Sequence, residues 1–158
     1  MPVDYLPIPC PMPLPKFLVF EGLDGSGKDT QLEKAFSYLR KKDKYAQIWV
    51  TREPTSATES GREIARKLRN EGFKDGYEAV ALYVKDRTEQ SEIRRGILKH
   101  SHILSSRFDL STYAYQCAQG LSFEEVRNAH DYSKILLPDV TFLFDVSMEN
   151  VEKRLFGR

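Results

Sequence analysis

The sequence has few cysteines, no long apolar run and no excess of charge of one sign. Its two cysteines lie far apart, outside any C-x-x-C pair, and the three histidines show no metal-ligand spacing with them, which excludes a disulfide framework and a structural zinc site. No run of about eighteen apolar residues occurs and the N-terminus lacks a signal-peptide pattern, so we expect a cytoplasmic protein with no membrane partner. With 24 basic and 23 acidic residues, a net charge of +1 gives no reason to expect a nucleic-acid partner.

A chain of 158 residues can bury one good core but is short for two domains. Residues 1–15 carry six prolines, which remove amide donors and favour an extended conformation over a helix or central strand. We therefore predict a proline-rich N-terminal extension over residues 1–15 and a single domain over residues 16–158. A proline-rich ligand for an aromatic-lined groove is the alternative interpretation of the extension.

From Lys16 onward, apolar periodicity predicts strands that alternate with helices. The run Phe17 to Phe20 is continuously apolar, which is typical of a strand buried on both faces of a parallel sheet. The expected strands cover residues 17–20, 47–51, 102–105 and 141–146, and the expected helices cover 28–41, a segment around 64–68, 77–96, 111–118, a segment capped by Ser122, and 148–155. This order predicts an α/β fold, a three-layer α/β/α arrangement around a doubly wound parallel sheet, with ligands at the carboxyl ends of the strands.

A glycine-rich segment lies between the first expected strand and the first helix. Residues 22–28 match G-x-x-x-x-G-K, in which backbone amides, a helix N-terminus and a lysine bind nucleotide phosphates. The less specific interpretation is a glycine-rich turn that binds nothing. The predicted ATP-binding residues are Gly22, Leu23, Asp24, Gly25, Ser26, Gly27, Lys28, Asp29 and Thr30.

The residue after Lys28 is Asp29, where this motif normally has a serine or threonine that binds Mg²⁺. A carboxylate is a good hard ligand for Mg²⁺, so we predict Asp29, together with Asp24, as the metal ligands. The alternative is that Asp29 only caps the helix at its positive end.

Five segments together resemble the thymidylate kinases, a family of P-loop nucleoside monophosphate kinases. They are residues 20–31 (FEGLDGSGKDTQ), 51–54 (TREP), 83–87 (YVKDR), 106–116 (SRFDLSTYAYQ) and 137–146 (LPDVTFLFDV), and the resemblance covers residues 16–158. It implies phosphorylation of dTMP to dTDP by Mg·ATP, in dTTP biosynthesis, by a homodimer.

The resemblance also implies roles for single residues. Lys28 and Arg107 would be catalytic, with Arg107 bridging the acceptor phosphate toward the donor. Tyr83 would stack on the pyrimidine, Arg87 would read a base oxygen and Tyr115 would exclude a 2′-hydroxyl group. The full predicted dTMP set is Arg52, Pro54, Tyr83, Arg87, Arg107, Ser111, Tyr115 and Gln116. Taken singly, each also fits core packing or a solvated charge.

Two departures from the family pattern affect these expectations. Ser106 stands where the family has an aspartate, and Asp29 stands where it has a hydroxyl, so we hypothesise that the two have exchanged places around one Mg²⁺. Loss of catalysis is the competing interpretation.

The sequence ends where the family continues, so we expect the lid and the C-terminal helix to be lacking. A catalytic arginine would normally come from that lid, and Arg154 and Arg158 are the candidates, with Arg158 assigned as the third catalytic residue. The alternative functions are a deoxynucleoside or other pyrimidine monophosphate kinase, or a nucleotide-binding module with weak or no catalysis.

Overall fold

The computed structural model describes residues 14–157, which form four strands and six helices. Most of the proline-rich extension and Arg158 therefore lie outside the described residues. In chain order the elements are β1 (Phe17–Glu21), α1 (Lys28–Lys42), β2 (Ile48–Arg52), α2 (Glu59–Arg69), α3 (Gly76–Ile97), β3 (His102–Ser106), α4 (Asp109–Ala118), α5 (Phe123–Ala129), β4 (Val140–Leu143) and α6 (Met148–Phe156).

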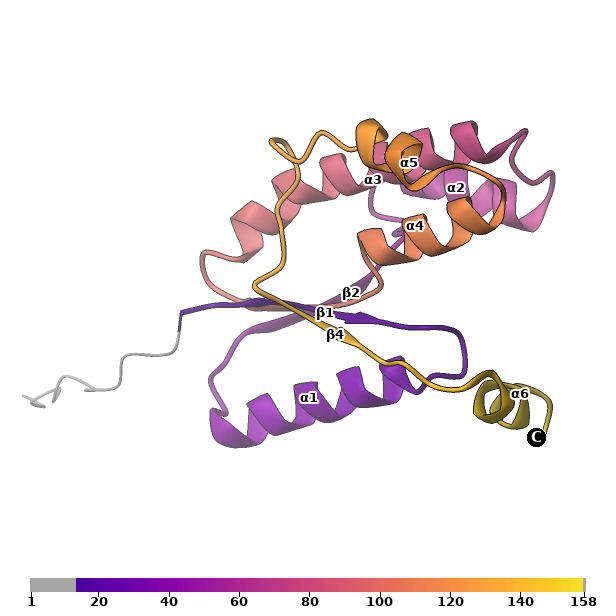
Figure 1. The fold of residues 1–158 in the computed structure, drawn as a ribbon. Helices are drawn as coiled ribbons and strands as arrows, with labels where there is room; N and C mark the ends of the chain where they lie inside the picture. Colours follow the sequence, from indigo (N-terminus) through magenta and orange to yellow (C-terminus); the bar gives the residue numbers. More distant parts are fainter. Residues whose placement is uncertain (1–13, 158) are drawn as a thin grey trace, which may run out of the picture.

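The four strands form one parallel sheet in the order β2-β3-β1-β4. Helix α1 covers one face of the sheet, and α2 to α5 gather on the other (Figure 1). Helix α6 follows β4 and lies beyond the end of the sheet at which β1 leads into α1 (Figure 1). The predicted α/β fold with a parallel sheet between helical layers is confirmed.

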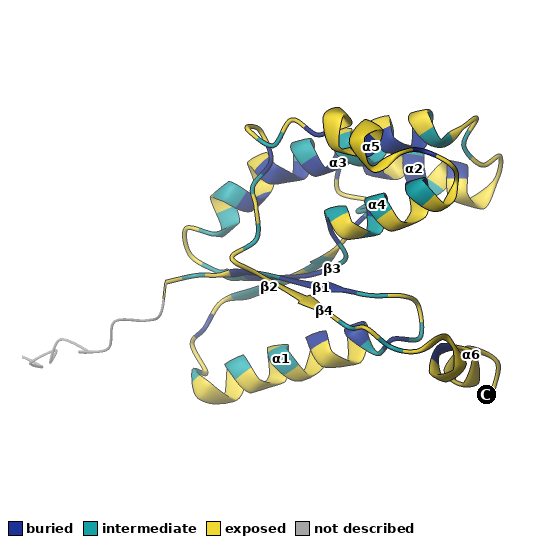
Figure 2. Ribbon diagram, viewed as in Figure 1, coloured by how far each residue is buried: buried dark blue, intermediate teal, exposed yellow. Residues whose placement is uncertain are grey.

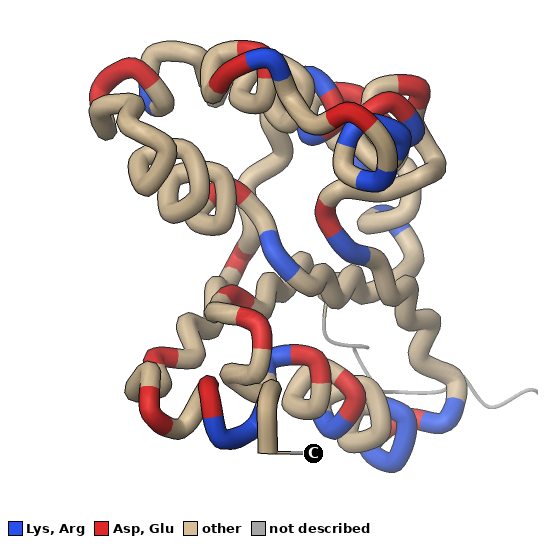
Figure 3. Tube along the Cα trace, turned by 90° about the vertical axis from the view of Figure 1, so that its right-hand side faces the viewer, with Lys and Arg blue, Asp and Glu red and all other residues tan. Residues whose placement is uncertain are grey.

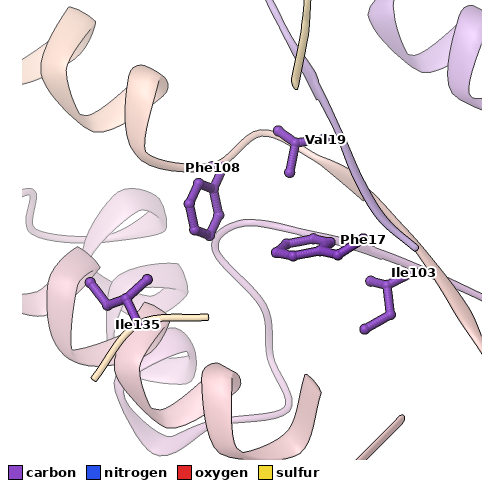
Figure 4. Close-up of a cluster of buried hydrophobic side chains, with 5 residues drawn as sticks. All are labelled: Phe17, Val19, Ile103, Phe108 and Ile135. Carbon is purple, nitrogen blue, oxygen red and sulfur yellow. The ribbon is translucent and has the colours of Figure 1, made fainter. Parts of the chain in front are cut away.

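The core lies between the sheet and the larger helical layer. Phe17, Val19, Ile103, Phe108 and Ile135 form its main cluster, and each is at most 4% exposed (Figure 4). The rings of Phe17 and Phe108 meet edge to face, with centroids 5.7 Å apart at 87°. Burial is concentrated in β1 and β3, whereas the edge strand β4 is exposed along its length (Figure 2).

The helix predictions hold to within about one turn at each end, whereas one strand prediction is wrong. The strand expected over residues 141–146 ends at Leu143. Its partner β1 ends at Glu21, directly opposite Leu143, and the amide of Phe144 donates the last bond, to the carbonyl of Glu21. The apolar run continues past this point, but no neighbouring strand is there to pair with it.

Charged residues of both signs are interspersed along both helical layers (Figure 3). Within residues 14–157, no helix combines the length and apolar character needed to cross a membrane.

The burial of the sheet predicts a clear stability difference between two strand positions. Ile103 is 0% exposed, so Ile103→Ala should leave a cavity and lower the free energy of unfolding by about 2–5 kcal/mol. Val50 on the neighbouring strand is 47% exposed, and Val50→Thr should change it by less than about 0.5 kcal/mol. Urea unfolding measures both values, and equal effects of the two substitutions would contradict the assignment of the core.

Candidate functional site

The predicted site residues gather at the carboxyl ends of β1, β2 and β3. This is where ligands bind in open parallel sheets, because the loops that follow neighbouring strands converge there. Residues 22–27 follow β1, Glu53 and Pro54 follow β2, and Arg107 follows β3. Each loop is anchored by the strand before it, so the side chains are held by the sheet.

Residues 22–28, called the phosphate loop below, have a backbone that needs glycine at defined points. Gly27 is the N-cap of α1 with φ 91°, a left-handed conformation that favours glycine. A side chain on Gly22, with φ 153°, would lie 2.9 Å from the carbonyl oxygen of Phe144. The amides of Gly25 and Gly27 donate no hydrogen bond within residues 14–157, and they precede the positive end of α1. The loop therefore has donors available for an anion.

Lys28 is 2% exposed, and its ammonium group lies between two carboxylates. Its Nζ is 3.0 Å from Asp24 Oδ1 and 3.7 Å from Asp29 Oδ2. The same Asp24 oxygen lies 2.6 Å from Nη2 of Arg107. Burial alone would raise the pKa of the Asp24 carboxyl, but the hydrogen bond from Lys28 and the charge of Arg107 outweigh it, so this pKa is lowered.

Asp29 and Ser106 lie in direct contact, as the exchange hypothesis requires. The hydroxyl of Ser106, the last residue of β3, donates to Oδ1 of Asp29 at 2.5 Å. Asp29 lies in the first turn of α1 but is not its N-cap, which is Gly27. Asp29 is thus oriented toward β3, which does not favour a capping role alone.

A cavity of about 400 Å³ opens beside Asp24 and Arg107. All eight residues predicted for the acceptor nucleotide line it. The complete lining is Asp24, Arg52, Glu53, Pro54, Leu68, Phe73, Tyr83, Arg87, Arg107, Phe108, Ser111, Thr112, Tyr115, Gln116 and Gln119. The structure thus brings together residues from five segments of the chain that are far apart in sequence.

Arg107 occupies a strained position between the phosphate loop and the cavity. Its φ is 71°, a conformation that costs a non-glycine residue roughly 1–2 kcal/mol. Its guanidinium donates to Asp24 and to the hydroxyl of Ser111 at 3.0 Å, and it lies 5.4 Å from the centroid of the Tyr115 ring. Burial alone would lower its pKa, but Tyr115 and Asp24 outweigh that effect and raise it. Arg107 therefore stays a cation.

Buried Glu21 holds the start of α4 in place, and with it the residues around Arg107. Its Oε1 accepts from the amides of Phe108 at 2.7 Å and Ser111 at 3.1 Å, and its Oε2 accepts from the Ser111 hydroxyl at 2.7 Å. A carboxylate at a helix N-terminus satisfies amides that have no partner within the helix. The end of β1 thus positions Ser111 at the wall of the cavity.

Arg87 and Tyr83 lie one helical turn apart on α3 and both line the cavity. Arg87 is only 1% exposed, and its guanidinium bonds Glu53, His130, the carbonyl of Phe108 and Thr112. Tyr83 is packed against Phe73, with ring centroids 5.9 Å apart. Burial raises the pKa of Tyr83, so its ring stays uncharged.

Gln116 is the clearest unsatisfied group in the cavity wall. It is 3% exposed, and its side-chain oxygen Oε1 has no hydrogen-bond partner among the described residues. A buried polar atom without a partner is costly, but this oxygen is not accessible from the cavity in the observed side-chain conformation.

Sequence reasoning missed several lining residues, among them Leu68, Phe73, Thr112 and Gln119. Leu68 was assigned only to a helix, and Phe73 lies in the loop before α3, where no periodic pattern applies. Their position in the cavity depends on how α2 and α3 pack on each other.

One of the two candidate lid arginines lies against the phosphate loop. Arg154 of α6 donates from Nη1 to the carbonyls of Gly25 and Ser26, each at 3.0 Å. Arg158, the one assigned as catalytic, lies outside the described residues, so its role stays a prediction.

Comparisons with known proteins agree with this geometry. The family model described as Thymidylate kinase matches residues 20–158. Thymidylate kinase of Cupriavidus necator is 33% identical over 145 residues, which cover 90% of this chain and 71% of that protein. The probable thymidylate kinase of Methanococcus maripaludis is 36% identical over 144 residues, 90% of this chain and 66% of that protein.

A solved structure shows the same fold. The crystal structure of thymidylate kinase from Ehrlichia chaffeensis superposes with a TM-score of 0.73 at 28% sequence identity, over 90% of this chain and 82% of that one.

His130, behind the cavity, predicts a pH dependence of stability. Burial lowers its pKa and the charge of Arg87 lowers it further, against the opposing effects of Val126 O, Asp109 and Glu53. Unfolding therefore takes up a proton between the folded pKa and the usual histidine pKa of 6.5, so the free energy of unfolding should fall as the pH is lowered from 6.5.

Urea unfolding at several pH values measures this slope. His130→Phe should lose the contribution of His130 to the pH dependence of the free energy of unfolding, whereas the exposed control His100→Gln should retain it. Equal slopes in the wild type and His130→Phe would contradict the prediction.

Proposed function

The chain belongs to the thymidylate kinase family and is a kinase that phosphorylates dTMP to dTDP, and from this premise we propose how its own residues carry out the reaction. In this proposal ATP is the donor, the phosphate loop binds it, and the cavity between α3 and α4 binds dTMP. The observation that carries the proposal is the position of Arg107, which bonds Asp24 of the phosphate loop and also lines this cavity.

The base is assigned to Arg87. One N–H of Arg87 has no acceptor within residues 14–157. Thymine and uracil present an acceptor at O4 for such a donor, whereas cytosine presents an amino donor at that position. Tyr83 and Phe73 supply an apolar surface for the ring and its methyl group.

The phosphates are bound by cations and amides near the loop. Lys28 and the amides of Gly25 and Gly27 face the donor, and Arg107 lies between the loop and the cavity, where it can bind the acceptor phosphate bidentately. Phosphoryl transfer needs positioning and charge neutralisation, and the acceptor is already an ionised phosphate. No general base is required of this chain.

Asp29 and Ser106 fit a magnesium ion. They offer a carboxylate and a hydroxyl in contact, and Mg²⁺ in kinases is usually held by one or two carboxylates with substrate phosphates and water. Asp24 fits less well, because its Oδ1 is already paired with Lys28 and Arg107. When bound, Mg²⁺ would neutralise charge on the donor phosphates.

A homodimer and a cytoplasmic location belong to the same proposal, on the strength of family membership alone. Sedimentation of the purified chain tests the first.

The proposed function is tested by a coupled ADP-release assay with Mg·ATP and each of dTMP, dUMP, UMP, CMP and thymidine. We expect turnover with dTMP, weak turnover with CMP and none with free thymidine. Arg107→Ala should lower kcat/KM by about 100-fold or more, because it removes the charge between the two phosphates. The control Arg127→Ala, an exposed arginine on α5, should leave the rate unchanged.

Turnover that does not depend on Arg107 would contradict the phosphate assignment. Equal use of dTMP and CMP would contradict the base assignment.

The same assay also tests the hypothesis that Asp29 and Ser106 have exchanged places around one Mg²⁺. Asp29→Ser should raise the Mg²⁺ concentration needed for half-maximal rate by about tenfold or more, because the site loses its carboxylate. Asp29→Ser combined with Ser106→Asp should recover much of that loss, since one carboxylate and one hydroxyl are again present. Equal rates and equal Mg²⁺ dependence of the two variants would exclude the exchange.

A further inference from the structure

We propose that His130 is a positioning residue for Arg87, which it holds so that the guanidinium presents one N–H to the base in the cavity. The inference rests on the proposed function, in which Arg87 contacts the base. It assigns a role to a residue that does not itself line the cavity.

Four of the five N–H groups of Arg87 are occupied within the described residues. Nε donates to Glu53 at 2.9 Å, and Nη2 donates to the carbonyl of Phe108 at 3.1 Å and to Thr112 Oγ1 at 3.0 Å. Nη1 donates one hydrogen to His130 Nε2 at 2.7 Å. The second hydrogen on Nη1 is the one without an acceptor.

His130 therefore binds the same nitrogen that carries the available N–H. A guanidinium is planar with its donors in a rigid fork, so the direction of one Nη1–H fixes the direction of the other. Arg87 is 1% exposed and is one of the residues that line the cavity, and the proposal assigns its remaining donor to the base there.

The protonation state of the imidazole follows from its two partners. Arginine can only donate, so Nε2 accepts from Arg87, and a backbone carbonyl can only accept, so Nδ1–H donates to the oxygen of Val126 at 2.7 Å. Both ring nitrogens are thus committed, and His130 is neutral in a single tautomer.

Aromatic neighbours hold the imidazole plane. The ring of His130 is nearly parallel to that of Tyr113, with centroids 5.6 Å apart at 7°, and to that of Tyr132, at 5.2 Å and 11°. Phe123 stacks on Tyr113 at 4.7 Å, and the Tyr132 hydroxyl donates to Asp109 at 3.0 Å. The stack connects the α4–α5 layer to Arg87 on α3.

Two substitutions separate the stacking of the His130 ring from its role as a hydrogen-bond acceptor for Arg87. His130→Phe keeps a flat ring between the tyrosines but has no acceptor for Arg87. In His130→Gln the ring is lost, yet the amide oxygen can take the place of Nε2. If His130 positions Arg87, dTMP affinity should depend on the hydrogen-bond acceptor at residue 130. If His130 is purely structural, dTMP affinity should depend on the aromatic ring instead.

The experiment is calorimetric titration of the full chain with dTMP and, separately, with ATP, alongside kcat and KM for each. The wild type is titrated first, and His130→Phe and His130→Gln follow. We expect His130→Phe to weaken dTMP binding by about tenfold or more while ATP binding is unchanged, because one base contact is misdirected. We expect His130→Gln to bind dTMP close to the wild type even if its thermal unfolding midpoint falls.

If His130→Phe does not fold, His130→Asn replaces it, because the shorter amide can occupy the place of Nδ1 but cannot reach Arg87. Unchanged dTMP binding in the acceptor-free variant, or equal weakening in it and in His130→Gln, would overturn the positioning role. A wild type that binds ATP but not dTMP would instead contradict the proposed function.

Discussion

The carboxylate of Glu53, directly after β2, pairs with two buried arginines of α3. Its Oε2 lies 2.8 Å from Arg87 Nη2, and its Oε1 lies 2.7 Å from Arg94 Nη1. Arg94 is 0% exposed and lies 5.1 Å from the ring centroid of Phe17 in the core. Neither guanidinium could stay buried without an anionic partner, and removing one member of such a pair typically costs about 3–5 kcal/mol. The carboxylate therefore joins the longest helix to the sheet.

This attachment makes the core and the site parts of one network. Phe108 packs on Phe17, its carbonyl accepts from Arg87, and its amide donates to Glu21 at the end of β1. Residues that bury the hydrophobic cluster thus also set the directions of the polar groups at the cavity. A site built on the ends of strands and on a helix is more rigid than one built on loops alone, which suits a reaction that depends on positioning.

Much of this arrangement could be predicted from the sequence, because motif spacing reports on loops that the sheet brings together. The candidate roles of Tyr83, Arg107 and Gln116 came from the resemblance of their segments to a family, and the structure places all three at one cavity. Arg94 could not be, since an arginine on a helix has the same pattern whether it is solvated or paired inside the core. The early end of β4 could not be predicted either, because the length of its partner β1 decides where pairing stops.

Asp24 is shared by two cations, and this has a consequence for how two substrates bind. Its Oδ1 contacts Lys28, which in the proposed function binds the donor phosphates, and Arg107, which in that proposal binds the acceptor phosphate. An anion that draws either cation away from Asp24 leaves the other cation as the sole partner of that oxygen. Donor and acceptor thus compete with the same carboxylate, and each must change the affinity for the other by the same factor. A single acidic side chain in this way couples the two subsites before any domain closes.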